Sequence, residues 1–191
     1  MPRAGLSTAA VLTAAADLAD REGLDAVTPS AVARSVGVRT PSLYAHVAGA
    51  EALREGVTTL ALDELADRVG AALAGRSGRD ALQALADTYR TYATEHPGRY
   101  AATRRAVDAD SPALAAGRRH TDLVTAVLRG YPVPERERVH AVRLVGSTVH
   151  GFTALQASGA FEHSNPEADV SWRRAVDALD VALRHWPEDG A

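Results

Sequence analysis

One short segment near the N-terminus gathers five side chains that can form hydrogen bonds with a polar partner. These side chains are Arg39, Thr40, Ser42, Tyr44 and His46. An arginine can reach the edge of guanine, and threonine and serine hydroxyls suit phosphate or base contacts. Between residues 26 and 50 there are two arginines and no acidic residue, although the whole chain has a formal net charge of −3. The chemistry fits the major groove of DNA, with weak phosphate affinity expected from a single segment because its positive charge is small.

Helix start and stop signals surround this segment. Thr28 followed by a proline is a typical N-cap, and Val27 is placed to pack on Val32 and fix the entry angle. Gly37 can adopt the left-handed conformation that ends a helix, and a second threonine–proline pair at Thr40 begins a third short helix that continues through His46. The pattern predicts two short helices around a tight turn, the helix-turn-helix arrangement. The alternative is that the same signals punctuate ordinary helical hairpins in a bundle.

The rest of the chain also predicts helices, and we expect an all-α fold. Apolar residues recur at three and four positions, and no stretch shows the alternation that is typical of strands. A first helix begins after Ser7 as N-cap and stops before Gly23. Glycine and proline divide the remainder into helices at about 50–74, 79–95, 98–107, 112–129, 135–157 and 169–185.

The segment at residues 24–57 resembles the DNA-binding domain of the TetR/AcrR regulators. The matching features are Thr28 at the start of the second helix, Gly37–Val38 at the turn and the run Leu43–Tyr44–x–His46. The resemblance implies an N-terminal three-helix helix-turn-helix DNA-binding domain at 1–48 and a C-terminal helical effector-binding and dimerisation domain at 49–191. It implies DNA contacts at Thr28, Ser30, Arg39, Thr40, Pro41, Ser42, Tyr44 and His46.

Two positions depart from the family pattern. Val47 replaces the aromatic residue that commonly follows the histidine, and Ala50 replaces a lysine that usually touches phosphate. The lost contact could be replaced by Arg3 or by backbone amides at the start of the fourth helix. Further along, the run from Thr148 to Phe152 resembles the subgroup named for a Trp-His-Gly signature, with valine in place of the tryptophan.

The C-terminal part offers candidates for ligand binding and for dimerisation. Tyrosine and histidine combine apolar bodies with polar tips, which suits a pocket among the middle helices, although a structural role is the alternative for each. The family places the last two helices between subunits, and an apolar seam with two small residues could serve there or in the chain's own core. The expected pocket residues are Tyr89, Tyr92, Tyr100, Arg104, His120 and His150. The expected interface residues are Gly146, Gly151, Trp172, Val176, Leu179, Leu183 and Trp186.

Several functional classes lack support in the sequence. The 191 residues include no cysteine, so thiolate nucleophiles, disulfides and cysteine zinc sites are excluded. Ser147 and His150 lie three residues apart, but no nucleophile elbow surrounds the serine, and no phosphate-binding loop or metal-binding histidine pair occurs. We therefore expect no enzyme, cofactor or metal. No signal peptide or membrane-length apolar run is present, so we expect a cytoplasmic protein.

The sequence thus favours a ligand-responsive transcriptional regulator. It would bind a palindromic double-stranded operator as a homodimer and be released by a small-molecule effector. The alternative is a helical ligand-binding or protein-interaction module whose DNA-binding head is degenerate, a hypothesis based on Ala50 and the low positive charge. The dependence of DNA binding on salt separates the two hypotheses.

Overall fold

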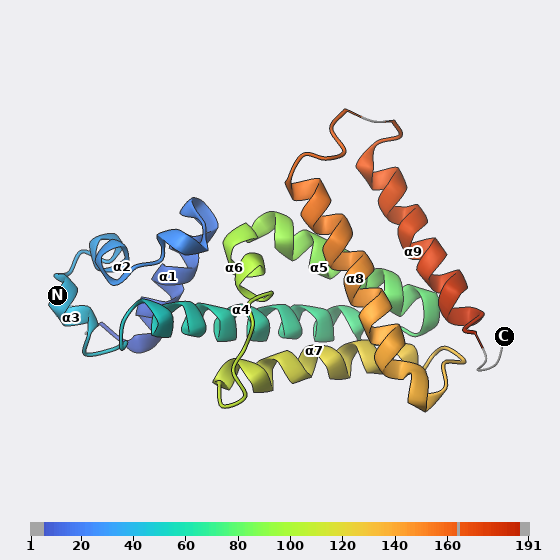
Figure 1. The fold of residues 1–191 in the computed structure, drawn as a ribbon, viewed down its shortest axis with the longest axis horizontal. Helices are drawn as coiled ribbons and strands as arrows, with labels where there is room; N and C mark the ends of the chain where they lie inside the picture. The colour runs from blue at the N-terminus through green and yellow to red at the C-terminus, as the bar shows by residue number, and fades with distance from the viewer. Residues whose placement is uncertain (1–5, 164, 188–191) are drawn as a thin grey trace. The chain divides into compact units, whose positions relative to one another are not determined.

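The computed structural model describes residues 6–163 and 165–187, and these residues form helices and connecting turns without any strand. The all-α prediction is confirmed (Figure 1). The elements are α1 (Thr8–Glu22), η1 (Leu24–Ala26), α2 (Pro29–Ser35), α3 (Thr40–Leu43), α4 (Ala50–Leu73), α5 (Gly78–Glu95), α6 (Pro97–Ala102), α7 (Pro112–Leu128), η2 (Glu135–Glu137), α8 (Arg138–Ala157) and α9 (Ala168–Arg184).

The described residues fall into two compact units. The first unit combines the described part of Met1–Leu65 with Glu95–Arg118, and the second combines Ala66–Thr94 with the described part of Arg119–Ala191. These units do not coincide with the division after residue 48 that the sequence led us to expect. The difference arises because the start of α4 and the whole of α6 pack with the N-terminal helices.

Local capping explains the two short helices of the first unit. The Thr28 hydroxyl accepts a hydrogen bond from the Ala31 amide at 3.2 Å, which satisfies a donor at the start of α2. At the other end Gly37 has φ +71°, and the Val38 amide donates to the Ala33 carbonyl at 2.9 Å. This closing bond and the left-handed glycine form the turn between α2 and α3. The predicted helix-turn-helix arrangement is therefore present.

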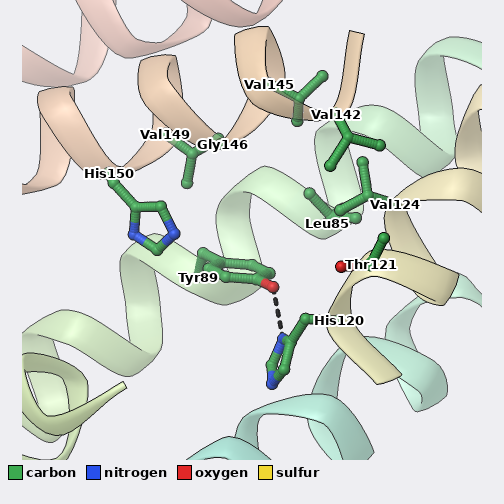
Figure 2. A pocket seen from close by; sticks show the side chains of 10 residues that line it. All are labelled: Leu85, Tyr89, His120, Thr121, Val124, Val142, Val145, Gly146, Val149 and His150. Carbon is green, nitrogen blue, oxygen red and sulfur yellow. Dashed lines mark hydrogen bonds between the residues drawn. The ribbon is translucent and has the colours of Figure 1, made fainter. Parts of the chain in front are cut away.

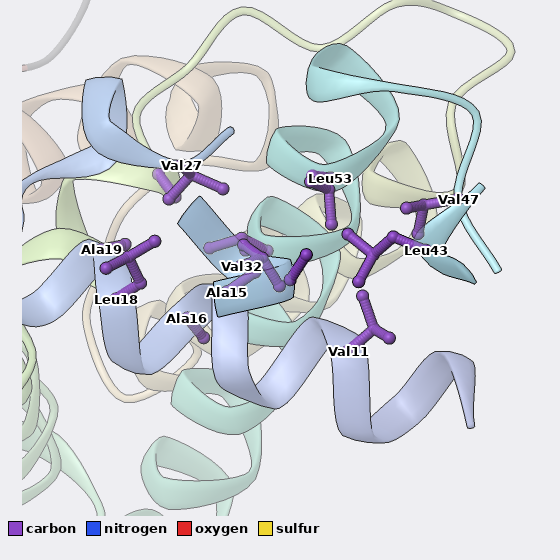
Figure 3. Close-up of a cluster of buried hydrophobic side chains, with 13 residues drawn as sticks. Val11, Ala15, Ala16, Leu18, Ala19, Val27, Val32, Leu43, Val47 and Leu53 are labelled. Carbon is purple, nitrogen blue, oxygen red and sulfur yellow. The ribbon is translucent and has the colours of Figure 1, made fainter. Parts of the chain in front are cut away.

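The first unit has a large apolar core, and Leu62, Ala113 and Ala116 form a second, smaller cluster. Val11 and Leu18 of α1 pack in the same cluster as Val32 of α2, Leu43 of α3 and Leu53 of α4, and all five are almost fully buried (Figure 3). The cluster is completed by Ala15, Ala16, Ala19, Val27, Ala33, Val47, Val57 and Ala102. Burial of these side chains supplies the hydrophobic stabilisation of the short helices, which would be unstable alone.

Two helix ends differ from the predicted ones. The helix expected at 98–107 ends at Ala102, because the Thr103 hydroxyl donates to the Tyr100 carbonyl at 2.8 Å and the Arg104 amide turns to the Ala101 carbonyl. The third helix was expected to reach His46, but regular α-helix ends at Leu43 and hydrogen-bonded turns follow.

In the second unit, Arg90 joins three helices. From α5 its guanidinium donates to Gln156 of α8 at 2.8 Å and to Asp169 of α9 at 2.5 Å. The same guanidinium lies over the rings of Phe152 and Trp172, within 6 Å of each centroid. The hydrogen bond from Arg90 to Asp169 lowers the pKa of the Asp169 carboxyl. Among the described residues, no helix is long and apolar enough to cross a membrane.

A single glycine lets α6 approach α1. A Cβ atom at Gly98 would lie 2.0 Å from the carbonyl oxygen of Ala19. We expect Gly98→Ala to lower the free energy of unfolding by about 3 kcal/mol, because the backbones of α6 and α1 would have to move apart. Gly117 in α7 is the matched control, since a Cβ there meets nothing within 4 Å.

Urea unfolding followed by circular dichroism measures both variants. Gly117→Ala should raise the free energy of unfolding by about 0.5–1 kcal/mol, because alanine favours a helix interior. Equal stability of Gly98→Ala and the wild type would show that the close approach is not maintained in solution.

Candidate DNA-binding surface and ligand pocket

Six of the eight predicted DNA-contacting residues lie at positions 39–46, on and around α3, which we call the recognition segment. The other two, Thr28 and Ser30, lie at the start of α2. Tyr44 is the most exposed large apolar side chain of the described chain, at 58%. Its neighbour Leu43 is fully buried, as is most of Val47, so these two anchor the segment while the intervening side chains remain accessible. Exposed residues of the predicted set are Ser30, Arg39, Pro41, Ser42 and Tyr44, and half-buried ones are Thr28, Thr40 and His46.

The residues use their polar atoms in different ways. The Thr28 hydroxyl accepts the capping hydrogen bond of α2, and its own proton can be donated to a phosphate. Arg39 precedes α3 in extended conformation and is exposed, so its guanidinium is accessible at the N-terminal end of that helix. Helix-turn-helix proteins contact base edges from this end of the recognition helix.

Charge at the start of α4 is partly neutralised. Glu51 is exposed there, and Arg105 donates to its carboxylate at 2.5 Å, with Arg54 at 3.9 Å. The pairing reduces the repulsion that this carboxylate would exert on a phosphate. Ala50 begins α4, so backbone amides face outward at the position where the family has lysine. Arg3 lies outside the described residues.

The second unit contains a cavity of ≈ 130 Å³ between α5, α7 and α8 (Figure 2). Its apolar wall consists of leucine and valine, and its polar end consists of tyrosine, threonine and histidine. The Tyr89 hydroxyl and His120 Nδ1 lie 2.6 Å apart, and the His150 ring meets the Tyr89 ring edge to face. The lining residues are Leu85, Tyr89, His120, Thr121, Val124, Val142, Val145, Gly146, Val149 and His150.

Half of the predicted ligand-binding residues line this cavity. Tyr89, His120 and His150 come together from three helices, although they are far apart in sequence. Tyr92 is instead fully buried beneath the guanidinium of Arg68 and does not line the cavity. Tyr100 and Arg104 do not line it either, since they belong to the first unit.

Tyr100 and Arg104 pack on each other instead. Tyr100 is 3% exposed, and the Arg104 guanidinium lies 5.3 Å from its ring centroid. Sequence reasoning also missed the apolar wall of the cavity. The α8 residues Val142, Val145 and Val149 recur at three and four positions, a signal that identifies a buried helix face but cannot show that a cavity lies beside it.

The predicted dimer seam on α9 faces the chain's own core. Trp172, Val176, Leu179 and Leu183 are each at most 4% exposed within one subunit, and the Trp172 indole N–H donates to Asp87 of α5. In this conformation these four side chains pack inside their own subunit, so they are not available for a contact between subunits. Gly146 lines the cavity and is half-buried, whereas Gly151 is exposed and Trp186 half-buried.

The faces of α8 and α9 that point away from the core carry exposed apolar side chains. Apart from Tyr44, every large apolar side chain found exposed in the described residues lies on these two helices. On α8, Leu144, Ser147, Gly151 and Leu155 form one stripe, and we call it the α8 stripe. The corresponding α9 stripe is Val170, Arg174, Ala178 and Val181 of α9 together with His185, which directly follows the helix.

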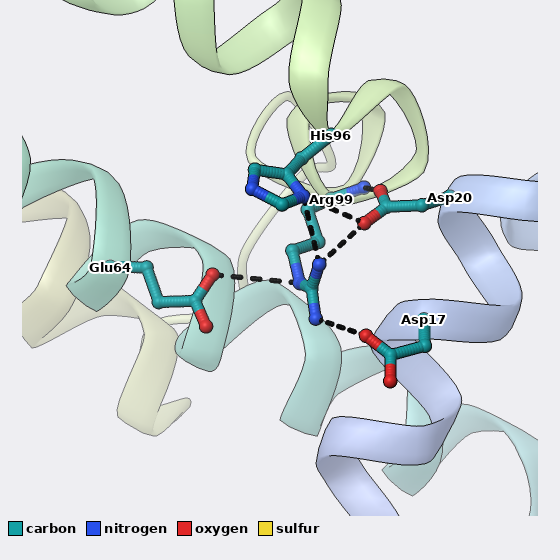
Figure 4. A network of polar contacts seen from close by, with 5 residues as sticks. All are labelled: Asp17, Asp20, Glu64, His96 and Arg99. Carbon is teal, nitrogen blue, oxygen red and sulfur yellow. Dashed lines mark hydrogen bonds and ion pairs between the residues drawn. The ribbon is translucent and has the colours of Figure 1, made fainter.

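A cluster of charged groups in the first unit could be mistaken for a catalytic site (Figure 4). Arg99 of α6 is 6% exposed and bonds Asp17 at 2.6 Å and Asp20 at 2.5 Å, with Glu64 at 3.5 Å. His96 Nδ1 lies 3.1 Å from the Asp20 carboxylate. The guanidinium occupies the space between the carboxylates, and no set of three ligands suited to a metal ion occurs in the described residues.

The electrostatics of this cluster keep Arg99 charged. Burial alone would lower the pKa of Arg99, but its hydrogen bond with Asp17 and the charges of Asp20 and Glu64 outweigh it and raise the pKa. A permanently protonated arginine that is paired with carboxylates can neither donate nor accept a proton in a reaction. We interpret the cluster as a structural clamp between α6, α1 and α4.

The helix-turn-helix with an accessible recognition segment, joined to a helical unit with a small cavity, defines a DNA-binding regulator of the helix-turn-helix class. The comparisons agree. Residues 11–57 match the family model of bacterial regulatory proteins of the tetR family, and residues 82–179 match the tetracyclin repressor-like C-terminal domain. The chain belongs to the TetR family of transcriptional regulators.

Individual relatives extend this result. YobS, an uncharacterised HTH-type transcriptional regulator of Bacillus subtilis, is 37% identical over 185 residues, which cover 96% of this chain and 92% of that protein. A Rhodococcus sp. RHA1 protein of unknown function shares the fold with a TM-score of 0.78 and 22% identity, covering 96% of this chain and 99% of that one. A TetR variant from Acinetobacter baumannii AYE in complex with minocycline has a TM-score of 0.70 and 22% identity, with coverage of 97% and 100%.

The clamp around Arg99 can be tested by mutation. We expect Arg99→Leu to lower the free energy of unfolding by about 3 kcal/mol, because the half-buried Asp20 carboxylate loses its cation. Arg105→Leu is the matched control in the same unit. Its partner Glu51 is 71% exposed, so its loss should cost less than about 1 kcal/mol. Equal losses in chemical denaturation would contradict the clamp.

Proposed function

We propose that this protein is a repressor that binds a near-palindromic operator as a homodimer in the cytoplasm and is released by a small-molecule effector. The observation that carries the proposal is the exposed recognition segment within a domain that matches the DNA-binding model of the family. The recognition segment supports the binding of DNA, the α8 and α9 stripes support the dimer, and the cavity supports the effector.

For DNA, the accessible side chains divide by chemistry. Arg39 has the donors for the guanine edge, whereas Ser42 and Thr28 offer hydroxyls for phosphate. Tyr44 presents an aromatic ring and a hydroxyl, which can contact a sugar and a phosphate together. Because the head has little positive charge, affinity from one head is weak, and two heads on one duplex are needed for tight binding.

For the dimer, the α8 stripe and the α9 stripe supply the surface. The two helices pack against each other in the second unit. The α8 stripe consists of apolar or small residues, and the α9 stripe combines such residues with Arg174 and His185. Small residues such as Ser147, Gly151 and Ala178 permit close helix packing, and Leu155 and Val181 add apolar area. A two-fold axis through this face would make a four-helix bundle from two subunits.

For the effector, the cavity beside α8 is the candidate site. The A. baumannii TetR variant of the same fold is in complex with minocycline. In this chain, α8 turns one face to the cavity and another to the α8 stripe, so a ligand that moves α8 also changes the proposed subunit surface. Differential affinity for two arrangements of the subunits is the requirement for release from DNA.

Selection of duplexes from a random library tests the proposal as a whole. Purified protein should enrich a near-palindromic site, and its affinity should fall steeply between two salt concentrations. Absence of any enrichment, from protein shown to be folded and dimeric, would favour the alternative of a degenerate head. The reasons to consider that alternative are Ala50 and the low charge of the head.

Two substitutions test the recognition segment. We expect Arg39→Ala and Tyr44→Ala each to weaken operator binding by at least about tenfold, since each removes a contact that is worth about 1–3 kcal/mol. Arg129→Ala is the charge-matched control, because Arg129 is exposed in the second unit. Fluorescence anisotropy with the selected duplex measures all three, and normal binding by both head variants would move the recognition surface elsewhere.

Two arginines introduced by mutation test the proposed dimer face. Leu155→Arg together with Val181→Arg should give monomers, because four charges would be buried in a two-fold interface. The control places two arginines at Ala71 and Thr91, which are exposed but lie outside both stripes. Sedimentation equilibrium distinguishes the masses. A dimer that persists in the stripe variant, with native circular dichroism, would place the interface on another face.

A further inference from the structure

We infer that the cavity between α5, α7 and α8 takes an uncharged molecule the size of one aromatic ring, bearing a single hydroxyl group, with phenol as the simplest example. The inference rests on the proposed function, because it names the chemical class of the effector. It depends on three properties of the cavity: its volume, its lack of fixed charge, and the position of its polar end.

The volume sets the size of the ligand. The cavity measures ≈ 130 Å³. An apolar cavity of about 150 Å³ is large enough for benzene, whereas sites for drug-sized molecules measure about 300–1,000 Å³. A ligand with four fused rings, such as minocycline, is therefore much larger than this cavity. The chain shares its fold with the minocycline-bound protein but has a cavity suited to a much smaller molecule.

The lining sets the charge of the ligand. Among the described residues around the cavity there is no aspartate, glutamate, lysine or arginine. A buried ammonium group would lose its hydration without gaining a carboxylate partner, and a buried carboxylate would find no permanent cation. A neutral molecule avoids both costs. Val124, Val145 and Val149 then contact its apolar body, as they would contact a hydrocarbon.

The polar end sets the functional group. The Tyr89 hydroxyl and His120 Nδ1 are already 2.6 Å apart, and the Thr121 hydroxyl comes from the same turn of α7 as His120 (Figure 2). A ligand hydroxyl can both donate and accept, so it can join a tyrosine–histidine pair whichever partner carries the shared proton. A methyl group of the same size cannot, and this difference allows a direct test.

Phenol and toluene are matched probes, because they have the same shape and differ only in hydroxyl against methyl. Their binding to the intact wild-type protein is measured by ligand-observed NMR titration. In Tyr89→Phe, phenol affinity should fall by about three- to tenfold relative to toluene affinity. Tyr92→Phe is the control on the same helix, because Tyr92 is buried outside the cavity, and the ratio of the two affinities should not change.

A second variant fills the cavity with a leucine side chain. A Cβ at Gly146 has room, since its nearest neighbour is His150 Cδ2 at 4.0 Å. The longer side chain of Gly146→Leu should project into the cavity and abolish binding of both probes, with circular dichroism unchanged. Binding of phenol by this variant as well as by the wild type would overturn the location of the site. Absence of phenol binding by the folded wild type would overturn the ligand class.

Operator binding is measured separately, which keeps the inference distinct from the proposed function. Phenol that binds the cavity and releases the selected duplex supports both. Phenol that binds with the expected dependence on Tyr89, but leaves the duplex bound, supports the ligand class and overturns its role as effector. Tight operator binding without any phenol or toluene binding supports the regulator and overturns the ligand class.

Discussion

The burial of one guanidinium constrains the whole first unit. Arg99 is almost fully buried, and its charge is tolerable only because carboxylates from α1 and α4 surround it. Beside it, Gly98 lets the backbone of α6 touch that of α1. The positions of α1, α4 and α6 are therefore coupled, and the recognition segment is held in the apolar core that α1 and α4 share.

In the second unit α8 connects two features, because one of its faces lines the cavity and another forms the α8 stripe. Val142, Val145 and Val149 line the cavity, whereas Leu144 and Leu155 face outward. A helix is too rigid for one face to move while the other remains fixed. A ligand that displaces α8 therefore also shifts the α8 stripe, which is the physical basis on which the proposed effector and the proposed dimer can be linked.

The sequence predicted best what depends on local chemistry. Thr28 and Gly37 act within their own turns, so the helix-turn-helix and its exposed residues could be located without tertiary information. The cavity needed contacts between distant helices, which is why Tyr92 and Tyr100 could not be told apart from Tyr89. On α9 both faces carry apolar residues, and the periodicity that identified Trp172 and Leu183 could not decide that their face is the internal one.

The weak charge of the DNA-binding head is the reason that the proposed dimer matters for affinity. If each head binds poorly alone, affinity of the proposed dimer for its operator depends on both heads engaging at once, at an effective concentration set by their separation. A change in that separation then costs most of the affinity, although no contact between Arg39 or Tyr44 and DNA need be destroyed. A ring-sized ligand that contributes only a few kcal/mol can control such a switch, because allosteric couplings of about 1–3 kcal/mol already change binding from about fivefold to 150-fold.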